Sequence, residues 1–138
     1  MTIDNIQQDI IEEFAFFDDW MERYEYIIEL GKTLAKIDEA NKTADNLIKG
    51  CQSNVWLFAE KKKDKVFFTA DSDAIITKGI IALLLRVYSN QTPEAILSTN
   101  PVFIDKIGLK ENLSPTRANG LLSMIKQIKL YALAFQSE

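Results

Sequence analysis

Asn54 to Ala70, NVWLFAEKKKDKVFFTA, is the stretch that decides the fold class. Its two ends, 54–59 (NVWLFA) and 65–70 (KVFFTA), are rich in aromatic and β-branched residues, which favour extended strands. The polar run 60–64 (EKKKD) between them is typical of a solvent-exposed connection. The stretch therefore predicts a β-hairpin, with lysines 61–63 in its solvated turn.

A helix is predicted directly after the hairpin, over residues 73–88. It is apolar on nearly all sides, so it should lie at the centre of the protein. The run Asp71-Ser72-Asp73 precedes it and offers side chains that can cap its first turn. The apolar positions of this helix are Ile75, Ile76, Ile80, Ile81, Leu83, Leu84 and Val87.

Two amphipathic helices are predicted before the hairpin. Apolar residues recur at helical spacing over residues 3–17, which indicates the first of them. Asp19 and Glu22 have the spacing of a capping box, so the second helix should begin there. Gly31 is expected to end that second helix.

Prolines mark three further helix starts in the second half of the chain. Thr92-Pro93, Asn100-Pro101 and Ser114-Pro115 each place a capping side chain before a proline suited to the first helical turn. The second of these helices is short and should end at Gly108, whereas the last should cover about 115–135. The side chains expected to be buried on the last helix are Leu121, Leu122, Ile125, Ile128 and Tyr131.

Residues 32–50 carry weaker signals and are rich in Lys, Asp, Asn and Thr. We expect mostly loop there, with room for a short third strand near Leu47 and Ile48. The resulting fold class is α+β, a small antiparallel sheet covered by helices. A chain of 138 residues with 47% hydrophobic content fits a single domain over residues 1–138.

Charge and composition exclude several classes of partner. The 16 basic and 20 acidic residues give a net charge of -4, whereas nucleic acids and anionic membranes require a dense positive surface. The N-terminus has no basic region followed by an apolar stretch, and the longest apolar run, residues 79–85, is too short to span a bilayer. We therefore expect no nucleic-acid or membrane partner and a cytoplasmic location.

Two residue types limit the chemistry of the chain. There is no histidine, which excludes Ser-His and Cys-His nucleophile pairs and nearly all zinc sites. There is one cysteine, which excludes an internal disulfide and an iron–sulfur cluster held by this chain's cysteines alone. Any thiol chemistry must therefore use Cys51.

Cys51 lies in the run Lys49-Gly50-Cys51-Gln52-Ser53, just before the first hairpin strand. Gly50 suits a tight loop that presents a side chain, because glycine adopts backbone angles that other residues avoid. Lys49 would favour the reactive thiolate. The alternative is that Cys51 is a buried free cysteine acting as a small apolar residue.

Three separated segments are the most distinctive parts of the sequence: 50–57 (GCQSNVWL), 71–79 (DSDAIITKG) and 113–121 (LSPTRANGL). These segments strongly resemble signatures of the SufE family of sulfur acceptor proteins. They occur in the order and spacing of that family, and the resemblance extends over residues 5–135. It implies a compact α+β domain similar to the IscU scaffold, with the cysteine on a loop at one end.

The resemblance also implies a mechanism. A partner cysteine desulfurase of the SufS or CsdA type, using its own pyridoxal phosphate, removes sulfur from L-cysteine and holds it as a persulfide. Cys51 would take that sulfur as its own persulfide, stimulate the desulfurase and pass the sulfur to iron–sulfur scaffold proteins. This chain would need no cofactor or metal of its own, because exchange between a persulfide and a thiol requires only an accessible thiolate and a suitable leaving thiolate.

Further site residues follow from the matched segments. Those expected on the cysteine loop or at the partner contact are Gly50, Gln52, Ser53, Asp71 and Asp73. Arg117 lies in the first turn of the last helix, where its guanidinium could steady an anionic sulfur or pair with a partner carboxylate. An ordinary surface arginine is the alternative. Helix capping is the simpler role for at least one of Asp71 and Asp73, and Asp73 could also hold the cysteine loop at rest.

Two other functions remain open from the residues. A one-cysteine thiol peroxidase or redox sensor would need a thiol with a lowered pKa. A binding module would activate a desulfurase without carrying sulfur, so a Cys51→Ser variant would still stimulate it fully. Whether the chain counts as an enzyme therefore depends on Cys51.

Overall fold

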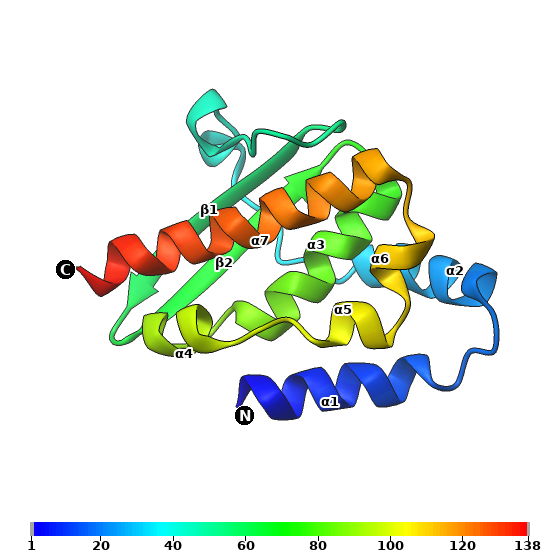
Figure 1. The fold of residues 1–138 in the computed structure, drawn as a ribbon. Helices are drawn as coiled ribbons and strands as arrows, with labels where there is room; N and C mark the ends of the chain where they lie inside the picture. The colour runs from blue at the N-terminus through cyan, green and yellow to red at the C-terminus, as the bar shows by residue number, and fades with distance from the viewer. Residues whose placement is uncertain (1, 138) are drawn as a thin grey trace.

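The hairpin forms the sheet of the protein, for which a computed structural model describes residues 2–137 (Figure 1). Strands β1 (Val55–Lys62) and β2 (Lys65–Ser72) pair antiparallel, from Val55 opposite Ser72 to Lys62 opposite Lys65. The turn is shorter than the predicted polar run, because the ladder of pairs continues until only Lys63 and Asp64 remain between the strands.

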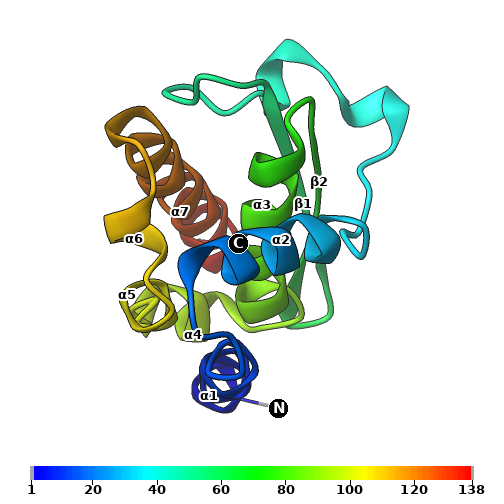
Figure 2. The same cartoon turned by 90° about the vertical axis from the view of Figure 1, so that its right-hand side faces the viewer.

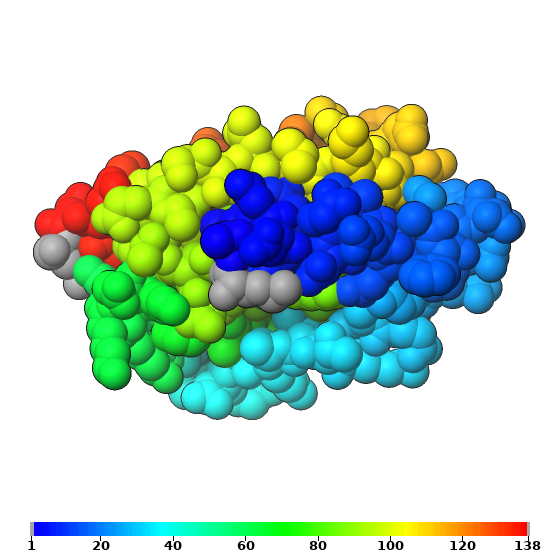
Figure 3. All heavy atoms as spheres, turned by 90° about the horizontal axis from the view of Figure 1, so that it is seen from below, coloured from blue at the N-terminus to red at the C-terminus, as the bar shows by residue number. Residues whose placement is uncertain are grey.

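Helices pack against this hairpin, so the predicted α+β class is confirmed. Figures 1 and 2 show α3 and α7 on the same side of the hairpin, while α1 lies at the far end from the loop that precedes β1. Seen from below, α1 lies across the surface of the molecule (Figure 3). The helices are α1 (Ile3–Phe14), α2 (Trp20–Gly31), α3 (Ile75–Tyr88), α4 (Pro93–Ser98), α5 (Phe103–Lys106), α6 (Leu109–Asn112) and α7 (Pro115–Gln136), with 3-10 helices η1 (Glu39–Asn41) and η2 (Ala44–Asn46).

The central position predicted for the helix after the hairpin is confirmed. Most side chains of α3 are buried, including Ile76, Ile80 and Leu84. α2 crosses α3 at very short range, because Gly31 and Gly79 have no side chains at the crossing. A Cβ on Gly79 would overlap the backbone carbonyl of Ile27, so only glycine allows this approach.

α7 packs along the hairpin through one stripe of its surface. The stripe contains Gly120, Leu121, Met124, Ile128 and Ala132. The prediction that Leu122 is buried is wrong, because it falls outside this stripe and is half-exposed. Tyr131 is only half-buried, and its hydroxyl donates to the carbonyl oxygen of Leu57 on β1 at 3.0 Å.

Three predicted details of the elements need correction. The first helix ends at Phe14 rather than residue 17, and the short third strand is only an isolated bridge between Leu47 and Trp56. Asn100 does not cap a helix: α5 begins at Phe103, whose backbone N–H donates to the Gln7 side chain of α1 at 3.1 Å. A tertiary contact therefore replaces the expected local cap.

Within residues 2–137, no helix has both the length and the apolar character needed to cross a bilayer.

Gly79→Ala and Gly120→Ala should change stability in opposite directions. A Cβ on Gly79 meets rigid backbone of α2, so this variant should lose about 1–3 kcal/mol of unfolding free energy. A Cβ on Gly120 would lie 3.6 Å from its nearest neighbour, which is an ordinary contact, so higher helix propensity should add about 0.5–1 kcal/mol. Urea unfolding measures both; equal effects of the two substitutions would contradict the packing described for the α2–α3 crossing.

Candidate functional site

The loop between Ile48 and Val55 carries Cys51 to the N-terminal part of α7 (Figures 1 and 2). Gly50 adopts a left-handed backbone with φ of 91°. A Cβ at this position would also lie 2.6 Å from the hydroxyl oxygen of Ser123 on α7. The left-handed backbone angle requires glycine, and the close approach to Ser123 shows that the loop is seated directly on the helix.

The Cys51 side chain lies in a shallow notch where the loop meets α7 at Gly120. Its thiol donates a weak hydrogen bond to the Gly120 carbonyl oxygen, with the sulfur 3.6 Å from that oxygen. A Cβ on Gly120 would lie 3.6 Å from the Cys51 Sγ atom, which is an ordinary contact distance, so the cysteine packs closely on this turn of α7. Cys51 is neither fully buried nor exposed, and it packs against the edge of the core.

Burial raises the pKa of the Cys51 thiol above its ordinary value. The sequence suggested that Lys49 would favour the thiolate, but desolvation of the sulfur in the notch acts in the opposite direction. The seated thiol is therefore mainly protonated near neutral pH, and a protonated thiol is a poor nucleophile.

The end of the loop is tied to the start of the segment before α3. The Asp73 carboxylate accepts a hydrogen bond from the Asn54 backbone N–H at 3.1 Å. The Ser72 hydroxyl donates to the Asn54 carbonyl oxygen at 2.8 Å. The prediction that Asp71 or Asp73 caps the helix is wrong, because α3 begins at Ile75 with Ala74 as an N-cap that makes no side-chain bond.

Asp71 lies inside an ion cluster rather than on the loop. Its side chain is 8% exposed, with carboxylate oxygens 3.1 Å from the Lys42 ammonium and 3.4 Å from that of Lys78. Burial favours the neutral acid, but these cations and the Ser72 backbone N–H outweigh it, so the pKa of Asp71 is lowered. Lys42 also lies over the Trp56 ring, 4.7 Å from its centre, so the cluster joins the loop of residues 37–46 to the hairpin.

The other predicted residues lie at the same end of the molecule. Arg117 is exposed in the first turn of α7, one turn before Gly120, and its guanidinium makes no hydrogen bond or ion pair with the described residues 2–137. Gln52 is exposed and Ser53 is half-buried. Gly50 and Cys51 thus lie against α7 and Asp73 binds the base of the same loop at Asn54, whereas Asp71 belongs to a separate cluster.

Sequence reasoning missed Gly120, Ser123 and Asn54. Gly120 lies in a matched segment, and a glycine inside a helix is a usable signal, because it is unfavourable there unless something must approach closely. Ser123 and Asn54 carry no such signal, since their roles depend on which atoms of the loop face them in the folded chain.

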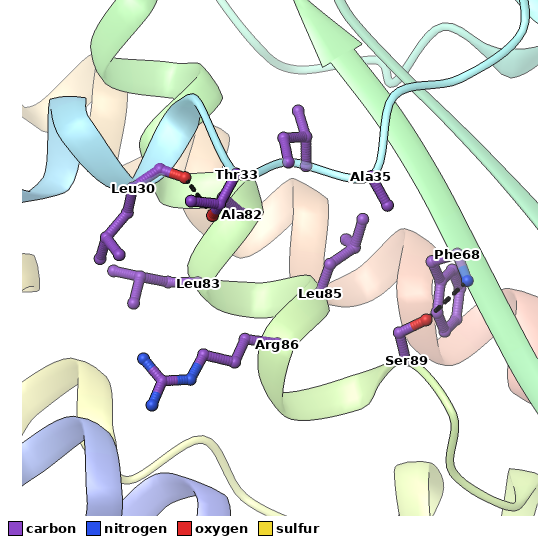
Figure 4. Close-up of a pocket in the computed structure, with 10 residues that line it drawn as sticks. Leu30, Thr33, Ala35, Phe68, Ala82, Leu83, Leu85, Arg86 and Ser89 are labelled. Atoms are coloured by element: carbon purple, nitrogen blue, oxygen red, sulfur yellow. Dashed lines mark hydrogen bonds between the residues drawn. The ribbon is translucent and has the colours of Figure 1, made fainter.

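Hollows elsewhere on the described residues contain no thiol, because Cys51 is the one cysteine of the sequence. The hollow in Figure 4 lies between the end of α2, β2 and the C-terminal half of α3, and its labelled lining contains no thiol or carboxylate. Arg86 on its rim forms an ion pair with Glu13 of α1. Across the described part of the chain, no group of three or more His, Cys, Asp or Glu side chains is arranged to hold a metal. The notch around Cys51 is therefore the candidate site.

Comparison with known proteins finds matches over most of the chain. The family model described as "SufE: Fe-S metabolism associated domain" matches residues 8–132. Similar proteins named "Uncharacterized SufE-like protein" occur in Rhizobium etli (44% identity over 125 residues, 87% of this chain and 84% of the relative), Rhizobium meliloti (43%, covering 87% and 89%) and Synechocystis (39% over 127 residues, covering 92% and 80%).

A solved structure is similar in fold. It is the solution structure of a hypothetical protein from Thermus thermophilus, with a TM-score of 0.80, 19% identity, and coverage of 96% of this chain and 97% of that one.

Gly50→Ala should expose Cys51 without unfolding the protein. The new Cβ clashes with the Ser123 hydroxyl oxygen and forces a side chain into left-handed backbone, so the loop should leave α7. Labelling by a bulky maleimide is expected to become several-fold faster. Ser123→Ala in the same chain should reverse part of the effect, because it removes the clash and leaves the backbone strain; an unchanged labelling rate in Gly50→Ala would contradict the seated loop.

The raised pKa of Cys51 should appear in its pH profile. The rate of iodoacetamide alkylation should rise with pH, because only the thiolate reacts. Its midpoint in the folded protein should lie above the midpoint measured for the same cysteine in urea-unfolded chain. A folded-state midpoint at or below the unfolded one would mean that the notch does not disfavour the thiolate.

Proposed function

This chain belongs to the SufE family and so to the proteins of iron–sulfur metabolism, and on that premise we propose that Cys51 is a sulfur carrier. It accepts sulfane sulfur from a cysteine desulfurase as a persulfide, and passes that sulfur on for iron–sulfur cluster assembly. The observation that carries the proposal is the position of the chain's single thiol on a glycine-supported loop at the surface of α7.

The transfer step needs no cofactor from this chain. The Cys51 thiolate attacks the outer sulfur of the donor's cysteine persulfide, and the bond between that sulfur and the donor cysteine breaks. The donor cysteine leaves as a thiolate and takes up the proton that Cys51 gave to solvent. Cys51 now holds the persulfide, and no net oxidation or reduction has occurred. The donor's pyridoxal phosphate acts earlier, when sulfur is removed from cysteine.

The resting geometry suits a protected carrier. In the notch the thiol is mainly protonated, because burial raises its pKa, and α7 covers one side of the sulfur. A carrier of this kind should react slowly with solvent oxidants until a partner draws the loop off the helix. Once the sulfur is in water or in a polar interface, the desolvation that raised the pKa of Cys51 is lost and the thiolate forms more readily.

The loop is held by contacts that a partner can replace. One weak thiol bond joins Cys51 to Gly120, whereas stronger bonds fix Asn54 beside it, at the base of the loop. Because the bonds at Asn54 are stronger than the bond at Cys51, we expect the loop tip to move while strand β1 stays in place. The exposed Arg117 guanidinium lies close enough along α7 to meet a partner carboxylate or an anionic sulfur, and we include it as a supporting residue.

Two alternatives are less well supported. A thiol peroxidase needs a thiolate at rest, and burial of Cys51 acts against one. A pure activator would bind the desulfurase without using the sulfur, and it would not need a thiol held on a loop against α7. Stimulation of the desulfurase is a separate consequence of removing its persulfide product, and we propose it together with carriage.

Intact-mass measurement after mixing the protein with a cysteine desulfurase and L-cysteine tests the proposal directly. The wild-type chain should gain the mass of one sulfur atom, and a thiol reductant should remove it. Cys51→Ala should gain nothing and should also fail to stimulate sulfur release. Full stimulation by Cys51→Ser would favour the activator, and a wild-type chain that gains no sulfur would rule out carriage.

A further inference from the structure

The charges of the chain are strongly unequal between its two parts. Residues 2–31, which contain α1 and α2, hold nine of the 20 acidic residues and one of the 16 basic residues. Their formal charge is therefore -8, while the rest of the chain carries +4. Such asymmetry indicates that the two parts suit partners of different charge.

Exposed aromatic and apolar side chains lie at the turn between these two helices. Phe16 is 85% exposed and Met21 is 62% exposed, and neither belongs to the core. Next to them is a hollow of about 480 Å³, whose apolar lining alternates with glutamates. Its lining residues are Phe17, Glu22, Glu25, Tyr26, Ile28 and Glu29. We call Phe16, Met21 and these lining residues the α1–α2 corner.

The corner is held in place from inside the protein. The Arg23 guanidinium donates to the carbonyl oxygens of Phe17 and Ile107, the latter at 2.9 Å, which fixes the turn against the α5–α6 segment. The Phe17 ring packs on Tyr26, with 4.9 Å between ring centres. Phe16 is thus presented on a fixed turn, and a fixed aromatic anchor loses little freedom when a partner covers it.

The only cation of these two helices does not neutralise the corner, because Arg23 is turned inward onto carbonyl oxygens. Glu29 does have a surface partner, Lys32, at 3.1 Å, whereas Glu22 and Glu25 form no ion pair with the described residues 2–137. An apolar patch of this size with an acidic rim fits a cationic protein segment that also offers an apolar pocket or side chain.

The corner lies away from the Cys51 loop. Figure 1 shows the α1–α2 turn near the lower right of the molecule and the loop at the top, and Figure 3 shows α1 and this turn on the surface. The charged residues near the Cys51 loop include Lys49, Lys126 and Arg117 together with Asp45 and Asp73, so this end is less acidic than the corner. The two surfaces differ in charge and lie apart, so they suit two different partners.

From this geometry we infer that the α1–α2 corner is a second docking surface, which binds a cationic segment of the iron–sulfur scaffold that receives the sulfur. The inference rests on the proposed carrier function. The donor meets Cys51 itself, and the acceptor is held through the acidic corner. Docking at a distance from Cys51 leaves the loop free to leave one protein and reach the other.

Binding of the purified scaffold and of the purified desulfurase to variants of the full chain tests this assignment. Phe16→Ala should weaken scaffold binding about tenfold, the loss typical of one hot-spot side chain. Glu25→Lys should weaken it several-fold and reduce its salt dependence. Glu60→Lys on β1 is the matched control, because it makes the same charge change at an exposed site outside the corner and should have no effect. Desulfurase binding should be unchanged in all three.

Each outcome has a defined meaning. Scaffold binding that is absent in the wild-type chain, or equal in wild type, Phe16→Ala and Glu25→Lys, overturns the inference. Weaker binding of the desulfurase instead of the scaffold also overturns it. Persulfide loading of Cys51 is measured on the same samples by intact mass. If all variants are loaded like wild type, the carrier function stands whatever the scaffold result, and a wild-type chain that is never loaded contradicts the carrier function itself.

Discussion

Gly79 lies against the backbone of Ile27, and this contact without side chains lets α2 and α3 cross at very short range. α3 is buried on nearly all sides, so its position fixes the layers around it. The hairpin leads into α3 through residues 71–74, and two of these residues, Ser72 and Asp73, supply the bonds that anchor Asn54. A wider crossing would displace α3 and with it the base of the cysteine loop.

Gly120 is another helical glycine with a close neighbour, but there the contact is of ordinary length. At Gly79 the neighbour is rigid backbone, so the contact fixes the core. At Gly120 the neighbour is the Cys51 side chain on a loop, so the contact holds a reactive group that can still leave. A core cavity would hold the thiol more firmly, but it would give no way out. A shallow notch lowers reactivity at rest by burial and still permits exchange at sulfur.

Hydrophobic periodicity, together with capping and proline residues, predicted the hairpin, the central helix and the two capped helices at Thr92 and Ser114. Each of these elements depends on residues that are neighbours in the chain. Predictions failed where a distant residue supplied the contact. Gln7 caps α5 in place of Asn100. Asp73 does not cap α3, but it binds the base of the cysteine loop, which is the other role predicted for it. Cys51 itself was identifiable from its uniqueness and its family signature. Its raised pKa was not, since that value depends on burial against α7 rather than on the adjacent Lys49.

Because the sequence has no histidine, no imidazole base can activate the Cys51 thiol. In many thiol sites a neighbouring base holds the thiolate ready, but this sequence contains no histidine to do so. The surroundings of Cys51 are therefore the main control on its reactivity. At rest, burial raises the pKa of its thiol. Reactivity then depends on whether the loop is seated, and seating depends on one weak bond to Gly120 and a glycine held over Ser123. A partner that replaces those contacts both exposes the sulfur and favours its thiolate, so recognition and activation become a single event.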